Sequence, residues 1–163
     1  MRVAVVSDAH SPRRWKQCPP AVADALRGVD MILHAGDVCQ VETLDELATF
    51  APVRAVLGNN DGVDVAAWGA PERLELELAG LPVAMIHDSG PATGRPARLR
   101  AMFPSAALVV FGHSHIPTDE THAGQRIFNP GSPTDRRRQP RGTMGDLVIE
   151  DGRLLSARIF PVT

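Results

Sequence analysis

The chain has no tyrosine, few aromatic residues of any kind (4%), only two cysteines and, among seventeen basic residues, a single lysine, Lys16. Scarce aromatic side chains leave few surfaces on which nucleic-acid bases could stack. Cys18 and Cys39 do not form a CxxC pair, so neither a disulfide framework nor a thiolate metal site is expected. This cysteine usage favours a reducing, cytoplasmic environment.

Long apolar runs are absent as well, since no stretch approaches the ~18 residues that a membrane span requires. The first residues run directly into an apolar strand, so we expect no signal peptide. The formal net charge of -2 gives no general attraction to nucleic acid or to an anionic membrane. An anionic substrate must therefore be drawn by a local site, nucleic acid is a poor candidate partner, and a homo-oligomer is left open.

What the sequence does have is enough apolar material for one compact unit. Hydrophobic residues make up 44% of the 163 residues. A chain of this size can bury roughly two-thirds of its unfolded surface. We therefore expect a single domain over residues 1–163, without repeats or linkers.

The first third of the chain alternates strands and helices. Val3–Val6 is a continuous apolar run, as in a strand that is buried on both faces. The segments that follow are predicted as a helix from Pro19 to Arg27, a strand at Met31–Leu33, a helix at Val41–Phe50 and a strand at Val53–Leu57. This βαβαβ order predicts a parallel sheet.

The remainder contains more strands than helices. Leu74–Leu78 alternates apolar and charged residues, which predicts a strand with one wet face. The later elements are predicted as strands at Val83–Ile86, Leu108–Phe111, Gln125–Phe128, Asp146–Ile149 and Leu154–Phe160, with a helix at Pro96–Met102. Two mixed sheets packed face to face, with helices outside, accommodate all of these elements.

Potential metal ligands follow the predicted strands closely. The seven candidates are Asp8, His10, Asp37, Asn59, His87, His113 and His115. Loops that leave the carboxyl ends of strands in an α/β sheet converge on one crevice, so these side chains can meet there. Oxygen and nitrogen ligands without sulfur suit Mn best, with Zn, Fe, Ni or Mg as alternatives.

Each segment also has a plainer reading. Asp8, Asp37 and the run Asn59–Gly62 could each form an ordinary turn, and His87 could be a hydrogen-bonded histidine at a strand end. Only the conjunction of all of them, in this order, favours a metal centre. Two other histidines are not expected to bind metal, because His34 reads as buried structure and His122 as a solvent-exposed residue.

In these motifs the sequence resembles the calcineurin-like metallophosphoesterase superfamily, most closely its small bacterial and archaeal phosphodiesterase branch. The resemblance rests on Asp-x-His, Gly-Asp, Gly-Asn-x-Asp, a strand-end His, Gly-His-x-His and Asn-Pro-Gly-Ser, from residue 1 to about residue 135. It implies an α/β fold, a four-layer α/β/β/α sandwich. It also implies that Asn129–Ser132 shapes the floor of the site.

The resemblance further implies roles for the candidate residues. Asp8, His10 and His115 would hold one divalent metal, Asp37 would bridge, and the second metal would be held by Asn59, His87 and His113. A hydroxide between the two ions would attack phosphorus. Asp37, Asn59, Asn60 and His113 are the residues we expect nearest the reacting phosphoryl group.

Two departures from the family pattern concern this site. Some relatives carry a histidine near the leaving group where this chain has Asn60, and an amide cannot deliver a proton at neutral pH. Asp88 follows His87 where relatives commonly have glycine, and it could orient a ligand or simply start a turn.

The prediction is therefore a metal-dependent phosphodiesterase acting on a small, nucleotide-like diester. A non-catalytic scaffold of the same fold is the first alternative, although all seven ligands are present. A nuclease is the second, supported only by the arginines at 136–138 and 141, which could grip a substrate or form a solvated charge run. Cys39, near Asp37, is either redox-sensitive or a packed structural thiol.

Overall fold

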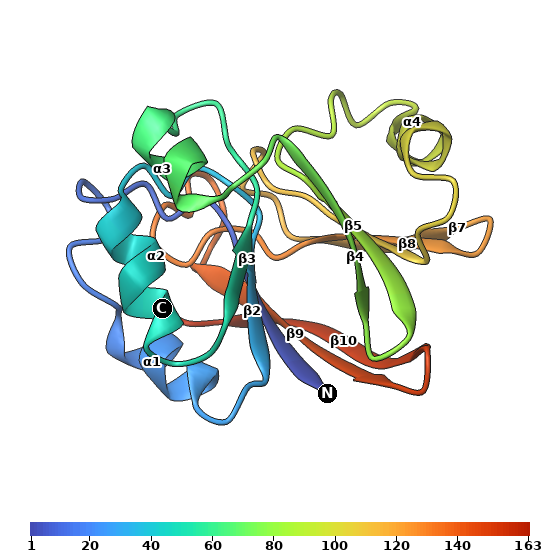
Figure 1. Cartoon of the computed structure of the whole chain (residues 1–163). Helices are drawn as coiled ribbons and strands as arrows, with labels where there is room; N and C mark the ends of the chain where they lie inside the picture. The colour runs from blue at the N-terminus through green and yellow to red at the C-terminus, as the bar shows by residue number, and fades with distance from the viewer.

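The computed structural model describes residues 1–163 as two five-stranded β-sheets packed face to face, with helices on the two outer faces (Figure 1). The first sheet has the order β10-β9-β1-β2-β3. Its strands are β1 (Arg2–Val6), β2 (Met31–His34), β3 (Val53–Ala55), β9 (Thr143–Glu150) and β10 (Arg153–Pro161).

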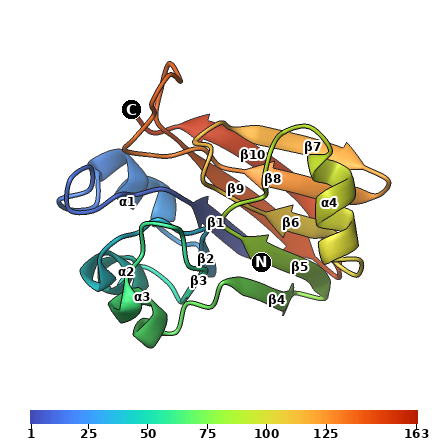
Figure 2. The ribbon, with the colours of Figure 1, turned by 90° about the horizontal axis from the view of Figure 1, so that it is seen from above.

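The parallel part of this sheet is formed by the chain's first third. β1 pairs in parallel with β2, and β2 with β3, while β9 lies antiparallel to β1 on its other side. The connections carry α1 (Pro20–Leu26) and α2 (Val41–Ala48), and α3 (Val63–Trp68) follows β3. All three helices lie on the same outer side of the sandwich (Figure 2). The carboxyl ends of β1, β2 and β3 therefore meet at one edge.

The second sheet has the order β4-β5-β6-β8-β7. Its strands are β4 (Arg73–Leu78), β5 (Leu81–Ile86), β6 (Leu108–Val110), β7 (Thr118–His122) and β8 (Gln125–Asn129). The three central strands β5, β6 and β8 are parallel, and β4 and β7 close the sheet as antiparallel edges. The helix α4 (Arg95–Met102) covers its outer face. None of the four helices combines the length and apolarity that crossing a membrane requires.

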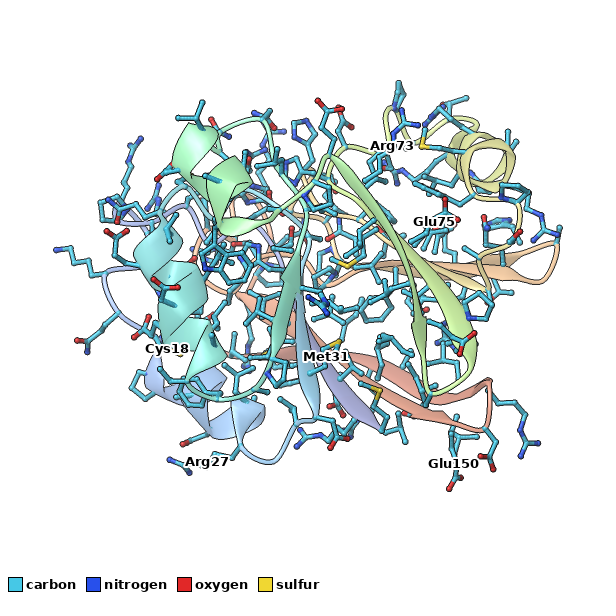
Figure 3. The ribbon with its side chains drawn as sticks, viewed as in Figure 1. Cys18, Arg27, Met31, Arg73, Glu75 and Glu150 are labelled. Atoms are coloured by element: carbon cyan, nitrogen blue, oxygen red, sulfur yellow. The ribbon has the colours of Figure 1, made fainter.

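Alternation along β1 explains why its run is apolar throughout. Val3 and Val5 belong to the cluster of buried residues between the two sheets, while Ala4 and Val6 belong to the cluster under the helices. β4 shows the other pattern, since its leucines pack inward and its charged residues face solvent. Figure 3 shows Glu75 on that outer side and Met31 between the sheets. Because successive side chains of a strand point to opposite faces, β1 contributes both to the cluster between the sheets and to the cluster under the helices.

The four-layer sandwich and every strand and helix predicted above are found, with ends shifted by a few residues. Two elements were not predicted. α3 is six residues long, without a side-chain cap, and too short to show a helical period. β7 is polar and largely exposed, so it lacks the apolar alternation by which an edge strand is recognised.

Candidate metal centre

The seven candidate ligands come together at the end of the sandwich opposite the N-terminus (Figure 1). Asp8 and His10 lie just after β1, and Asp37 lies just after β2. The other candidates follow β3, β5 and β6, at Asn59, His87, His113 and His115. Parallel strands deliver all of them to one edge, because their carboxyl ends point the same way.

The first cluster consists of Asp8, His10 and His115, whose ligand atoms all lie within 4.8 Å of one another. Oδ1 of Asp8 is 3.3 Å from Nε2 of His115 and 3.9 Å from Nε2 of His10. The other oxygen of Asp8, Oδ2, accepts hydrogen bonds from the Ser7 hydroxyl and the His113 amide. One carboxylate oxygen is thus anchored and the other faces the histidines.

The second cluster consists of Asp37, His87 and His113. The side-chain oxygen Oδ1 of Asn59 joins it, at 3.2 Å from Nε2 of His87 and 2.9 Å from Nδ1 of His113. Oδ2 of Asp37 lies 3.4 Å from Nε2 of His87 and 3.7 Å from Nε2 of His10. Asp37 therefore contacts both clusters, as a shared ligand must.

The donor set fits two divalent cations. Oδ1 of Asp8 is fully buried and has no hydrogen-bond partner, which is costly for a carboxylate oxygen. Nε2 of His10 and Nε2 of His115 face each other at 3.2 Å, in rings stacked 5.1 Å apart. Oxygen and nitrogen atoms that face one another in this way suit a divalent cation.

The far side of two histidine rings is fixed by backbone carbonyls. Nδ1 of His87 donates to the Ala35 carbonyl at 2.7 Å, and Nδ1 of His115 donates to the Asp135 carbonyl at 2.5 Å. Donation from Nδ1 selects the neutral tautomer that leaves Nε2 free as a ligand. Sequence reasoning could not find the Asp135 carbonyl, because a backbone acceptor has no residue-type signal.

Asp61 organises the loops beneath Asp37, a role that the sequence did not reveal although the residue belongs to the Gly-Asn-x-Asp motif. Its carboxylate accepts backbone hydrogen bonds from Asp37 at 2.9 Å, Cys39 at 2.6 Å and Gly58 at 2.7 Å. These three bonds tie the loop after β2 to the loop after β3. The aspartate of the motif thus holds a ligand in place rather than serving as one.

Asn60 is bound to the Asp37 carboxylate by two hydrogen bonds. Its backbone amide donates to Oδ1 at 2.8 Å and its side-chain Nδ2 donates to Oδ2 at 2.7 Å. The side chain is therefore part of the site, at the position where some relatives carry histidine.

Five of the seven candidates have a left-handed backbone. Their φ angles are 57° for Asp8, 50° for His10, 56° for Asp37, 65° for His113 and 58° for His115. This conformation costs a residue other than glycine roughly 1–2 kcal/mol. Concentrated strain of this kind is typical of functional sites, where it aims side chains inward.

Neighbouring glycines allow the loops to approach the carboxylates. A Cβ at Gly58 would lie 2.2 Å from the backbone nitrogen of Asp37, and one at Gly112 would lie 2.0 Å from the Ser7 hydroxyl. No real Cβ tolerates such distances, so the glycines of Gly-Asn and Gly-His are required by space.

The two carboxylates also set the protonation of the histidines. Burial acts to lower the pKa of His87, but hydrogen bonding to Asp37 and the charges of Asp8 and Asp37 outweigh it and raise that pKa. For His115, burial is likewise outweighed by Asp8, so its pKa is raised, although the charge of Arg137 opposes this. Burial lowers the pKa of His10. The pKa of Asp37 lies well below its usual range, since its bonds with His87 and Asn60 overcome burial.

The remaining histidines behave as the sequence predicted. His34 is fully buried, lies outside both clusters, and has a pKa that burial lowers, so it is neutral. His122 is exposed on β7 and pairs with Glu120 at 2.9 Å.

Two of the open alternatives are decided by contacts. Asp88 accepts the Gly90 amide at 2.7 Å and is exposed, so it starts a turn rather than orienting a ligand. Cys39 is half-buried, with Sγ 3.8 Å from Nδ1 of His10, and burial raises the pKa of this thiol to about 12. The contact with His10 and the raised pKa favour a packed structural thiol over a redox-sensitive one.

The Asn129–Ser132 segment supports the site from below. The side-chain Nδ2 of Asn129 donates to the Gly112 carbonyl at 2.9 Å and to the Ser114 hydroxyl at 3.1 Å. The Ser132 hydroxyl donates to the Asp8 carbonyl at 2.8 Å. The segment therefore joins the loop after β6 to the loop after β1.

Comparison with known proteins agrees with this geometry. The family model of the calcineurin-like phosphoesterase superfamily domain matches residues 1–152. A probable metallophosphoesterase of Methanothermobacter thermautotrophicus is 35% identical over 165 residues, which cover 98% of this chain and 92% of the relative.

Solved structures show the same fold. Zinc-bound Vps29 of Entamoeba histolytica superposes with a TM-score of 0.79 at 23% identity, covering 100% of both chains. An archaeal protein described as a phosphodiesterase superposes with a TM-score of 0.75 at 19% identity, covering 98% of this chain and 100% of its own. At such identities the likeness concerns the fold alone.

Proposed function

The chain belongs to the calcineurin-like phosphoesterase superfamily, and on that premise we propose that it hydrolyses a small, nucleotide-like phosphodiester with the help of two divalent metal ions. The observation that carries the proposal is the pair of ligand clusters that Asp37 contacts together. In this assignment Asp8, His10 and His115 hold one ion. Asn59, His87 and His113 hold the other.

Two divalent ions in this position would polarise the phosphoryl oxygens and make a water between them acidic enough to attack phosphorus at neutral pH. The chain's own residues prepare that reaction. Asp8 and Asp37 balance only part of the metal charge, so the site retains attraction for a diester monoanion. Asn59 is neutral and adds a ligand oxygen without cancelling more of that charge.

Asn60 favours a diester with a good leaving group. Its Nδ2 donates to Asp37 and has one further hydrogen that can reach a phosphoryl oxygen. An amide cannot protonate a departing alkoxide, so an ester whose leaving group is already acidic should react fastest.

The scaffold alternative requires that the seven candidate ligands no longer support catalysis. All seven side chains are present and close together, and five of them have a left-handed backbone, a strained conformation typical of functional sites. The nuclease alternative rests on exposed arginines alone, and a steep salt dependence of nucleic-acid binding would be its signature.

The test is hydrolysis of aryl diesters, aryl monoesters and cyclic nucleotides after chelation and metal addition. We expect the metal-free protein to be inactive, and Mn to restore diester hydrolysis better than Mg does, because four histidine ligands suit the softer ion. Full activity with metal analysis showing an empty site would sink the two-metal proposal. Mn-dependent activity confined to monoesters would sink only the diester assignment.

A further inference from the structure

A cavity lined by arginines lies beside the metal centre and has no part in the chemistry described so far. Its volume is about 330 Å³, which is at the small end of the ~300–1,000 Å³ typical of ligand sites. No hydrophobic residue lines it. The lining residues are Arg14, Pro133, Thr134, Asp135, Arg136, Arg137, Gly142 and Thr163.

The cavity carries an excess of positive charge. Three arginines face one aspartate. Arg136 and Arg137 form no ion pair, and Arg14 has only a 3.9 Å contact with Asp135. Guanidinium groups left without a carboxylate partner are suited to a phosphoryl group, which they can bind through two parallel hydrogen bonds.

Hydrogen bonds hold the residues that line the cavity in position. The Thr134 hydroxyl donates to the Ala9 carbonyl at 2.9 Å, and the Asp135 amide donates to the Ser132 hydroxyl at 2.8 Å. The turn at 136–139 is closed by a bond from the Gln139 amide to the Arg136 carbonyl at 2.8 Å. Within that turn Arg137 has a left-handed backbone, with φ of 47°, a conformation that arginine adopts only against strain.

Two residues connect the cavity to the metal centre. The Asp135 carbonyl accepts the hydrogen bond from Nδ1 of His115, while its carboxylate faces Arg14. Arg137 lines both this cavity and a second one of about 210 Å³ that contains Ser114 and His115. Asp135 and Arg137 thus place the arginine cavity next to the first ligand cluster.

A cavity beside the second ligand cluster has more acidic than basic residues in its lining. This cavity, of about 330 Å³, is lined by the candidate ligands Asn59 and His87 together with Glu72, Arg73 and Asp88. Two carboxylates against one arginine disfavour an anion on that side. Of these two cavities, only the one on the side of His115 has an excess of positive charge.

We propose that Arg14, Arg136 and Arg137 bind a second, non-reacting phosphate of the substrate. The substrate class is then a phosphodiester that also carries a phosphomonoester group. This inference rests on the proposed phosphodiesterase function and adds the orientation of the substrate, with its extra phosphate on the side of His115.

Two matched esters test the inference in the Mn-loaded enzyme. They are the p-nitrophenyl ester of thymidine 5′-phosphate and the same ester with an added 3′-phosphate, which share the leaving group and the nucleoside. We expect the phosphorylated ester to have the higher kcat/KM. Arg137→Gln and Arg14→Gln should each lower kcat/KM for that ester by about ten-fold, mainly through KM, and change the plain ester less than two-fold.

Two further arginines serve as controls. Arg13 neighbours Arg14, is exposed and does not line the cavity, so Arg13→Gln should leave both esters unchanged. Arg141 belongs to the same loop as Arg137 but lines a different cavity, with Pro117 and Pro140. If Arg141→Gln lowered kcat/KM as much as Arg137→Gln did, general loop charge would be the cause and the inference would be overturned.

A second readout does not depend on turnover. Inorganic phosphate is titrated into the metal-free, ¹⁵N-labelled protein, and the side-chain Nε–Hε signals of the arginines are followed. We expect saturable shifts for Arg14, Arg136 and Arg137, and none for Arg13.

The ester kinetics and the NMR titration together show whether the phosphodiesterase proposal or the arginine cavity has failed. Saturable shifts with no turnover of either ester would overturn the phosphodiesterase proposal, and with it the substrate assignment, and leave only an anion site. Turnover without any preference and without shifts would overturn the arginine cavity alone. Shifts without a preference between the esters would overturn the substrate assignment, because the cavity would then serve free phosphate.

Discussion

Replacing Asp61 with alanine should loosen the site without removing any candidate ligand. The Asp61 carboxylate accepts three backbone hydrogen bonds, from Asp37, Cys39 and Gly58 at 2.6–2.9 Å. A hydrogen bond to a charged acceptor contributes about 1.5–3 kcal/mol. Water can replace part of that at a half-exposed position and the three bonds are not additive, so we expect a loss of about 3 kcal/mol.

Thermal unfolding of the metal-free variants measures this loss. For a chain of this length, about 3 kcal/mol corresponds to a fall in Tm of roughly 6–12 °C. Asp64→Ala is the matched control, since that exposed aspartate sits in the first turn of α3 and should cost only a few tenths of a kcal/mol. Asp61→Asn should fall between the two, because an amide presents only one acceptor oxygen.

The same variants should separate in metal binding. Without Asp61 the backbone of Asp37 is released from the loop after β3, so the shared ligand is no longer held between the clusters. We expect weaker Mn binding by Asp61→Ala than by Asp64→Ala in equilibrium dialysis. Equal melting temperatures and equal Mn binding for the two variants would refute the organising role of Asp61.

Two further predictions concern protonation. The metal-free protein should lose stability as pH rises above about 7, because His87 and His115 have raised pKa values when folded and their contribution disappears as pH passes through those values. His10 and His34 have lowered pKa values and act in the opposite direction, chiefly below about 6.5. Urea unfolding at about pH 7 and pH 8.5 that showed no fall would contradict this. Asn60→His should speed alkyl diesters by up to ~10²–10⁴-fold and aryl diesters little, since a positioned acid helps poor leaving groups most. Unchanged dependence on leaving-group pKa would show that another residue supplies the proton.

The convergence of the ligands could be predicted because it depends only on local features. Each candidate follows the end of an apolar strand, and parallel pairing carries the carboxyl ends of those strands to one edge. The same reasoning separated the buried His34 from the exposed His122. The assignment of the seven residues as ligands stays a proposal, as do the single-domain extent, the cytoplasmic location and the small-molecule partner.

What could not be predicted depends on contacts between distant segments. The Asp135 carbonyl behind His115, the three amides on Asp61 and the bond between Asn60 and Asp37 involve backbone groups, which every residue has. The left-handed backbone of five candidates has no residue-type signal either, because aspartate and histidine occur in many turns. Arg14 joins the arginines of the later loop only through the fold.

The central claim, two divalent ions sharing Asp37, is tested most directly by counting bound metal. The native chain and His122→Ala, whose exposed side chain lies outside both clusters, should each bind two Mn ions per chain in equilibrium dialysis with elemental analysis. Asp37→Ala should fall to one ion or fewer, with loss of the magnetic coupling that electron paramagnetic resonance detects between paired Mn ions. Two coupled ions in Asp37→Ala, or at most one in the native chain, would contradict the account.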